Sequence, residues 1–223
     1  MSTKLALFDL DHTLIPMDSD YEWGAFTTTL GWNDAVEFTR RNEVFYSQYK
    51  AGTLDIHEYI SFATLAIRQH GATKSIAAHA QYMSTIVQNA IKSQALELVR
   101  AHQAAGDLVV IVTATNEFVV GPIAQEFGVP ELIAIKLARD PVSGWFNGKI
   151  EGTPSFREGK VTRVAQWLAE RGLSWDTVQA TFYSDSINDL PLLEKVAYPV
   201  ATNPDERLRA IAQMRGWRIL ELF

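Results

Sequence analysis

The chain contains no cysteine in its 223 residues. Disulfide bonds and thiolate metal sites are therefore excluded. The sequence also lacks any cluster of lysine and arginine, and its formal net charge is −6. Because a protein that binds the phosphate backbone of nucleic acids needs a basic patch, we expect no nucleic-acid surface.

Long apolar runs are also missing. No stretch reaches the roughly 18 consecutive apolar residues of a membrane-spanning helix. The N-terminus has no basic segment followed by an apolar core and a cleavage site of small residues, so we expect a cytoplasmic protein without a membrane partner. With 47% hydrophobic and 21% charged residues, the chain can bury one core, or a core and a smaller satellite. Composition does not indicate an oligomeric state.

The functional prediction starts from residues 5–14, LALFDLDHTL. Four apolar residues lead to Asp9, Asp11 follows two positions later, and Thr13 and Pro16 come after it. A short apolar run that ends in a turn is typical of a buried strand. Ligands of open α/β sheets bind beyond the carboxyl ends of the strands, so Asp9 and Asp11 are predicted to lie at a site. On its own, such a pair is more typical of a helix cap or a solvated turn.

Residues 17–92 are rich in aromatic side chains and helix formers. Asn33 or Asp34 is the expected cap of a helix through residue 50, and Asp55 is the expected cap of a helix through residue 70, whose apolar residues fall on one face. Ser75 is the expected start of a third helix that runs toward residue 91. We therefore expect an all-helical insertion after the first strand, in which the aromatic side chains form a core of their own.

From residue 93 onward, strand and helix patterns alternate. This alternation predicts a doubly wound parallel sheet, an α/β fold. The turn signal Asn147-Gly148 predicts a hairpin over residues 145–150. The other expected elements are strands at 107–115, 132–137, 180–186, 198–201 and 218–222 and helices at 93–103, 116–127, 158–172 and 187–195.

Polar side chains of complementary type follow the predicted strands. Besides Asp9 and Asp11 they are Thr113, Lys160, Asp185 and Asp189. Each has an ordinary explanation alone: a strand-terminal threonine, a solvated helix lysine, a turn or cap aspartate. Together, the carboxylates would concentrate negative charge that a hard divalent cation such as Mg²⁺ relieves, in combination with a phosphate group.

These residue types suit the chemistry of phosphate transfer. Lys160, the Thr113 hydroxyl and backbone N–H groups of the following helix would hold phosphoryl oxygens. Asp9 would be a carboxylate nucleophile that forms an aspartyl-phosphate. Asp11 would protonate the leaving alcohol and later deprotonate the attacking water.

The four segments resemble the motifs of the haloacid dehalogenase (HAD) superfamily of phosphohydrolases in order and separation. The helical insertion is similar to the cap of the phosphoserine-phosphatase-like subgroup, subfamily IB with a C1-type cap. The resemblance implies a Rossmann-like core of residues 1–16 and 93–223 and a helical cap of residues 17–92. The segments are Asp9-Leu-Asp11-His-Thr13, Thr113, Lys160 and Ser184-Asp185-Ser-Ile-Asn188-Asp189.

The resemblance also implies a cofactor and an intermediate. Mg²⁺ would be bound by Asp9, the backbone carbonyl of Asp11 and Asp185, with Asp189 acting through a metal-bound water, and Asp9 would be phosphorylated. We therefore predict a Mg²⁺-dependent phosphomonoesterase for a small phosphorylated metabolite. A phosphotransferase to an acceptor alcohol is the alternative enzyme. A receiver-type signalling module fits less well. The acceptor aspartate of such a module is not followed by an acid two residues later, and the module has no helical insertion of this size.

Two cap positions bear on the substrate. In phosphoserine phosphatases an acidic cap residue receives the substrate amine, and Asp18 falls at that position. Their carboxylate-binding arginine is replaced by Ala63 in an ungapped alignment of residues 52–63, and Arg68 lies more than a turn away. This pattern favours a phosphorylated amino alcohol such as histidinol phosphate, with phosphoserine as the alternative.

Other cap residues have a weaker claim. The rings of Tyr21 and Trp23 could favour a cationic or aromatic leaving group, although such residues more often form the core. Arg40 and Arg41 could supply an anion site from another helix. His12 is expected to point away from the two neighbouring aspartates.

Overall fold

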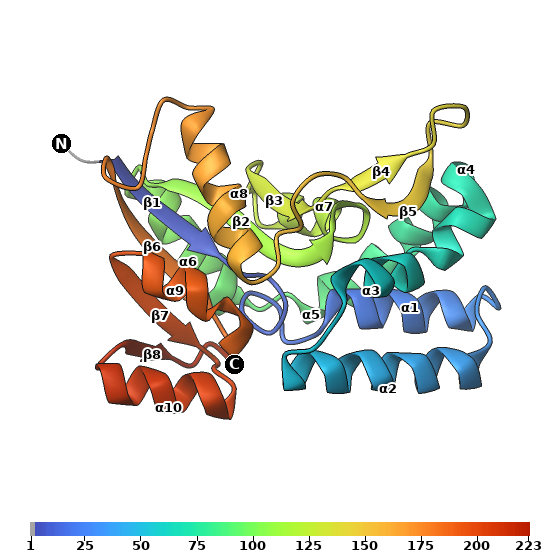
Figure 1. The fold of residues 1–223 in the computed structure, drawn as a ribbon, viewed down its shortest axis with the longest axis horizontal. Helices are drawn as coiled ribbons and strands as arrows, with labels where there is room; N and C mark the ends of the chain where they lie inside the picture. Colours follow the sequence, from blue (N-terminus) through green and yellow to red (C-terminus); the bar gives the residue numbers. More distant parts are fainter. Residues whose placement is uncertain (1–2) are drawn as a thin grey trace.

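The computed structural model describes residues 3–223, so residues 1 and 2 of the predicted core segment 1–16 lie outside the described residues. Its central element is a six-stranded sheet in the order β3-β2-β1-β6-β7-β8, in which every pairing is parallel. The predicted doubly wound α/β fold is confirmed (Figure 1). The strands are β1 (Thr3–Phe8), β2 (Leu108–Asn116), β3 (Leu132–Ile135), β6 (Val178–Ser184), β7 (Tyr198–Thr202) and β8 (Arg218–Leu220).

Helices cover both faces of this sheet. Alternate residues of β1 point to opposite faces, so Leu5 and Leu7 join one apolar cluster while Ala6 and Phe8 join the other. The first cluster is covered by α8 (Glu158–Ala169), α9 (Leu190–Lys195) and α10 (Glu206–Arg215), and the second by α6 (Ser93–Ala104) and α7 (Glu117–Glu126). A short 3₁₀ turn, η2 (Ile187–Asp189), precedes α9.

The insertion after β1 is helical. It comprises α1 (Ser19–Thr29), α2 (Ala35–Ala51), α3 (Ile56–Ala63), α4 (Leu65–Tyr82), the π-helix η1 (Met83–Val87) and α5 (Gln88–Ala90). Asp34 and Asp55 cap α2 and α3 by accepting backbone N–H groups, as predicted. The helix predicted over 55–70 is wrong at its end, because Thr64 leaves the helical backbone and α4 begins after it. The helix predicted over 75–91 comprises the end of α4, the π-helix η1 and α5. The helical backbone of α4 is interrupted at Gly71, where φ is 74°.

The predicted hairpin is displaced along the chain. β4 (Leu137–Arg139) pairs antiparallel with β5 (Phe146–Ile150), and the chain reverses where Asp140 accepts N–H groups of the two residues Val142 and Ser143. Asn147-Gly148 lies inside β5 at a register irregularity, so the turn predicted there is wrong. A side chain at Gly148 would lie 2.7 Å from the guanidinium of Arg68, which explains the glycine without a turn.

This hairpin contacts the helical insertion, because β5 packs against α3 and α4 (Figure 1).

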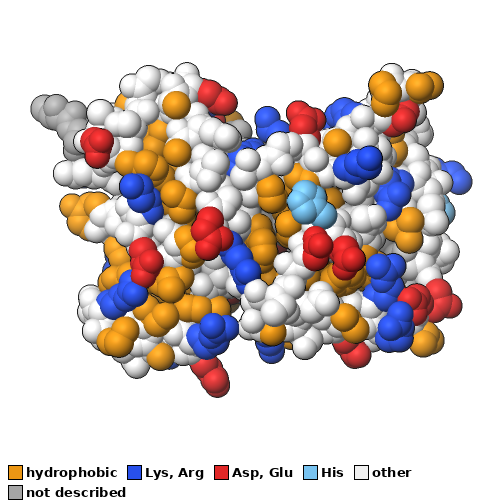
Figure 2. Space-filling model, in the orientation of Figure 1, with side chains coloured by type: hydrophobic (Ala, Val, Ile, Leu, Met, Phe, Trp, Pro, Cys, Tyr) orange, Lys and Arg blue, Asp and Glu red, His pale blue; other side chains and the backbone are white. Residues whose placement is uncertain are grey.

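Charged side chains of both signs are interspersed over the face shown in Figure 2. In the described part of the chain, no helix is both long and apolar enough to cross a membrane.

Candidate active site

Asp9 is held at the carboxyl end of the central strand. Its backbone N–H donates to the Tyr183 carbonyl of β6 at 2.9 Å, and the residue is 7% exposed. The chain then turns tightly, since the N–H groups of Thr13 and Leu14 both donate to the Leu10 carbonyl. The turn brings Thr13, a buried residue, back beside Asp9.

The Thr13 hydroxyl joins two carboxylates from distant parts of the chain. Its oxygen lies 3.3 Å from Asp9 Oδ2 and 3.1 Å from Asp185 Oδ1, and it accepts the backbone N–H of Asp185 at 3.0 Å. Because a hydroxyl has a single hydrogen, it can donate fully to one of the two carboxylates at a time. The ends of β1 and β6 therefore present two carboxylates that share one proton donor.

Lys160 joins the second pair of carboxylates. Its Nζ donates to Asp9 Oδ1 and to Asp189 Oδ2, both at 2.7 Å, and the side chain is 2% exposed. Burial alone would lower the pKa of Lys160, but Asp189 and Asp9 raise it above its usual value. The lysine is therefore a permanent cation. Ser184 also donates to Asp189 Oδ2, at 2.7 Å.

Carboxyl groups outnumber cations in this hydrogen-bonded cluster. It contains three aspartates, Asp9, Asp185 and Asp189, and one lysine, Lys160. Burial first, and then repulsion from Asp9 and Asp189, raise the pKa of Asp185 well above its usual value. Among residues 3–223, no group of three or more carboxylate or imidazole side chains is already arranged to hold a metal ion. The arrangement suits a hard cation that takes two carboxylates and completes its shell with carbonyls and water.

Asp11 points from the same turn toward the helical insertion. Its Oδ1 accepts the backbone N–H of Ser19 at 2.9 Å, and its Oδ2 accepts the Thr115 hydroxyl at 2.7 Å. Burial, and next the nearby Asp18, raise the pKa of Asp11 to about 6, against the opposing effect of these hydrogen bonds. Asp11 can therefore gain and lose a proton near neutral pH.

Thr113 lies within β2 rather than at its end. Its hydroxyl accepts the N–H of Thr115 at 3.1 Å, and its carbonyl accepts the Ser155 hydroxyl at 2.6 Å. The pairing of β2 with β3 shifts register between Val112 and Asn116, so Thr113 falls where the strand leaves the regular sheet. Asn116 then caps α7, and the helix N-terminus therefore begins close to Thr113 in the chain.

The predicted cap residues lie in different surroundings. Asp18 caps α1 by accepting the Tyr21 N–H at 2.9 Å, and burial raises its pKa. Tyr21 is 40% exposed, but Trp23 is 1% exposed. Trp23 is therefore a core residue and does not face the site. Four aromatic rings surround it: Phe26, His79, Tyr82 and Phe118.

The two arginines named as alternatives are engaged elsewhere. Arg40 pairs with Glu37 at the surface, and Arg41 lies over the rings of Phe45 and Phe62. His12 is exposed, with a φ of 56°.

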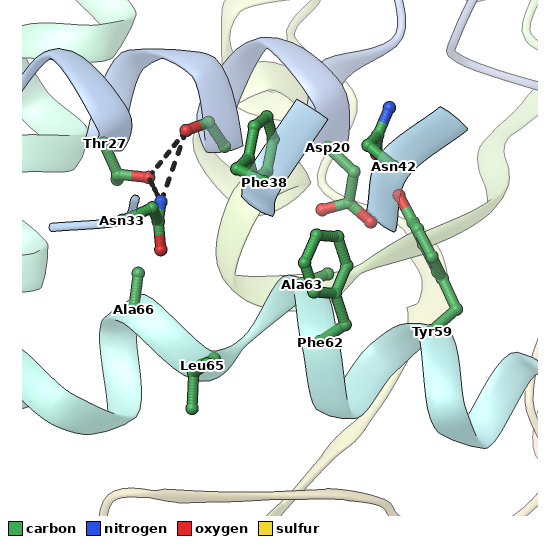
Figure 3. Close-up of a pocket in the computed structure, with 11 residues that line it drawn as sticks. Asp20, Thr27, Asn33, Phe38, Asn42, Tyr59, Phe62, Ala63, Leu65 and Ala66 are labelled. Carbon is green, nitrogen blue, oxygen red and sulfur yellow. Dashed lines mark hydrogen bonds between the residues drawn. The ribbon is translucent and has the colours of Figure 1, made fainter. Parts of the chain in front are cut away.

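One buried carboxylate, that of Asp20, was not identified from the sequence. Asp20 Oδ1 accepts the Asn116 side-chain N–H at 2.8 Å, while Oδ2 is buried without a hydrogen-bond partner among residues 3–223. It faces a cavity of about 30 Å³, room for about one water molecule. Figure 3 shows the Asp20 carboxylate and the Tyr59 hydroxyl turned toward one another there. In the sequence Asp20 has only the signature of a first-turn helix acid.

Fold and site together define a class: an α/β protein in which neighbouring parallel strands present carboxylates around a buried lysine, beside a helical insertion. The family model of haloacid dehalogenase-like hydrolases matches residues 6–194. The chain belongs to this family, as the sequence motifs predicted.

Two curated relatives are similar over most of the chain. A histidinol-phosphatase of Neisseria meningitidis is 41% identical over 218 residues, which cover 97% of this chain and 98% of the relative. A phosphoserine phosphatase of Mycobacterium tuberculosis is 30% identical over 220 residues, which cover 97% of this chain and 70% of the relative.

Solved structures share the fold. A protein of unknown function from Bordetella pertussis matches with a TM-score of 0.93 and 47% identity over 100% of both chains. A substrate-bound phosphoserine phosphatase matches with a TM-score of 0.67 and 16% identity over 99% of this chain and 93% of that one. At that identity the second match supports the fold alone.

Proposed function

We propose that the protein is a Mg²⁺-dependent phosphomonoesterase that hydrolyses a small phosphorylated metabolite through a phosphorylated Asp9. The observation that carries this proposal is the pair of bridges at Asp9, with Lys160 on one carboxylate oxygen and Thr13 beside Asp185 on the other. This arrangement orients Asp9, and the Lys160 cation opposes the burial that raises the pKa of Asp9. The phosphatase names of the two curated relatives support the same activity.

The metal would be held by Asp9, Asp185 and the backbone carbonyl of Asp11. Asp189 would act through a water, which agrees with its direct bonds to Lys160 and Ser184. When bound, Mg²⁺ supplies positive charge that lets a phosphate dianion approach the carboxylates.

The protein side chains account for the proton and bond changes. An Asp9 oxygen attacks phosphorus, and the bond from phosphorus to the leaving oxygen breaks while Asp11 gives that oxygen its proton. Asp11 then takes a proton from water, the water oxygen bonds to phosphorus, and the Asp9–phosphorus bond breaks to release phosphate. Lys160 keeps Asp9 oriented, and the Thr113 hydroxyl and nearby N–H groups bind phosphoryl oxygens.

We infer that the substrate is an amino-alcohol phosphate, with histidinol phosphate as the first candidate. The curated relative of 41% identity carries that activity in its name. Asp18 and Asp20 lie near Asp11, because Asp18 raises the pKa of Asp11 and both of these carboxylates raise the pKa of Asp20. A substrate ammonium group would relieve this repulsion. Arg68 donates to the Ser61 carbonyl at 2.7 Å, and Ala63 lines the small cavity of Figure 3.

Phosphoserine is the second candidate, because the relative of 30% identity is named for it. The test compares initial rates on histidinol phosphate, phosphoserine and phosphoethanolamine at one Mg²⁺ concentration. We expect the highest kcat/KM on histidinol phosphate. A higher kcat/KM on phosphoserine would contradict the substrate assignment, and no phosphate release from any ester would contradict the activity.

A further inference from the structure

The end of α2 contacts the loop after β6 through side-chain and backbone groups. The Tyr49 hydroxyl lies 2.8 Å from Ser186 Oγ. The Asn188 side chain donates to the Tyr49 carbonyl at 3.3 Å, and Arg207 donates to the Lys50 carbonyl at 3.1 Å. In Figure 1 this end of α2, where the chain rises into α3, faces the core. The insertion therefore touches the loop that carries Asp185.

Ser186 has a central position in that loop. Its backbone N–H donates to Ser184 Oγ at 3.2 Å, and its own Oγ accepts the N–H of Asn188 at 3.2 Å. Ser184 in turn donates to Asp189 Oδ2 at 2.7 Å. The Tyr49 hydroxyl is therefore the outer end of a hydrogen-bonded chain that passes through both serines to Asp189.

The surroundings of Tyr49 agree with this connection. Burial, and next the carboxylates of Asp185 and Asp189, raise the pKa of Tyr49 well above its usual value. The phenol therefore stays protonated and remains a hydrogen-bond donor. Tyr46 on the same helix is a contrasting residue, since it is 52% exposed and lies beneath Lys50 Nζ.

We propose that Tyr49 is a positioning residue, whose hydroxyl holds Ser186 and thereby the loop that presents Asp185 and Asp189. Turnover then depends on this hydroxyl contact between α2 and the loop, although Tyr49 takes no part in bond making. The functional half of this inference rests on the proposed phosphatase activity. The structural half, that one cap hydroxyl restrains the loop, does not.

The consequence of losing the hydroxyl follows from the contacts. Tyr49→Phe keeps the ring and the backbone contact with Asn188, so α2 stays docked. Ser186 loses a partner, and its hydroxyl is free to turn away from the Asn188 N–H. We expect kcat to fall about 3- to 10-fold, the range that a lost hydrogen bond corresponds to, and the KM for p-nitrophenyl phosphate to change less than about 2-fold.

The experiment uses Tyr49→Phe, Ser186→Ala, the double variant and the control Tyr46→Phe. Hydrogen exchange of a peptide covering residues 184–190 is measured alongside kcat. We expect faster exchange in Tyr49→Phe, wild-type exchange and kcat in Tyr46→Phe, and a double variant no slower in turnover than Ser186→Ala, because coupled residues are not additive.

Two results would overturn the inference. One is wild-type exchange of the 184–190 peptide in Tyr49→Phe, and the other is a double variant whose loss of kcat equals the product of the two single losses. Failure of the proposed function gives a different result. If the wild-type protein has no phosphatase activity but Tyr49 restrains the loop, the 184–190 peptide still exchanges faster in Tyr49→Phe than in the wild type.

Discussion

Replacing Lys160 by methionine tests the electrostatics of the site. Lys160→Met keeps an unbranched chain but leaves Asp9 and Asp189 buried without the cation that lies 2.7 Å from each. Breaking a buried ion pair costs about 3–5 kcal/mol, so we expect a loss of that size in the free energy of unfolding at pH 8. The measurement is urea unfolding in EDTA, which removes any contribution from divalent ions.

The loss should depend on pH in a defined direction. Burial already raises the pKa values of Asp9 and Asp189 in the wild type, against the opposing charge of Lys160, so removing Lys160 raises both pKa values further. The folded state then binds more protons than the unfolded state, and stability falls as pH rises. Between the wild-type and the variant pKa of each carboxyl, every pH unit recovers about 1.4 kcal/mol, so the loss should shrink to less than about 2 kcal/mol at pH 5.

The matched control is Lys149→Met, because Lys149 is an exposed lysine of β5. It should change the free energy of unfolding by less than about 0.5 kcal/mol at both pH values. A Lys160→Met variant that loses less than about 1 kcal/mol at pH 8, or loses the same amount at pH 5, would refute the reasoning.

Four further outcomes are expected. Asp9→Asn should abolish phosphate release from p-nitrophenyl phosphate while the circular dichroism spectrum stays unchanged; more than a few per cent residual turnover would contradict the nucleophile assignment. Asp11→Asn should slow turnover roughly 10²- to 10⁴-fold, and wild-type turnover would exclude the acid–base role. Asp18→Asn should raise the KM for histidinol phosphate more than that for p-nitrophenyl phosphate, and equal changes would remove Asp18 from the specificity argument. EDTA should stop turnover and added Mg²⁺ should restore it; turnover that persists in EDTA would contradict the metal requirement.

The parts of the fold that the sequence predicted well have local signals. The apolar run before Asp9 and the capping aspartates Asp34 and Asp55 each act within a few residues. The predictions that were wrong concern residues whose conformation depends on contact with a distant segment of the chain. Asn147-Gly148 has the sequence of a tight turn, but it lies in a strand against the side chain of Arg68.

The candidate site shows the same division. The motif residues Asp9, Lys160 and Asp185 could be named because their spacing resembles a known pattern, and the structure brings them together. Contacts between parts of the chain far apart had no such signal. Tyr49 and Ser186 are 137 positions apart, and Asp20 and Asn116 are 96 apart.

The most direct measurement traps the intermediate. The enzyme is quenched during turnover of histidinol phosphate and treated with borohydride, which reduces an aspartyl-phosphate to homoserine, and the peptides are then sequenced by mass spectrometry. The account predicts homoserine at position 9 and unmodified aspartate at position 11. Homoserine at another position, or none during active turnover, would contradict the account.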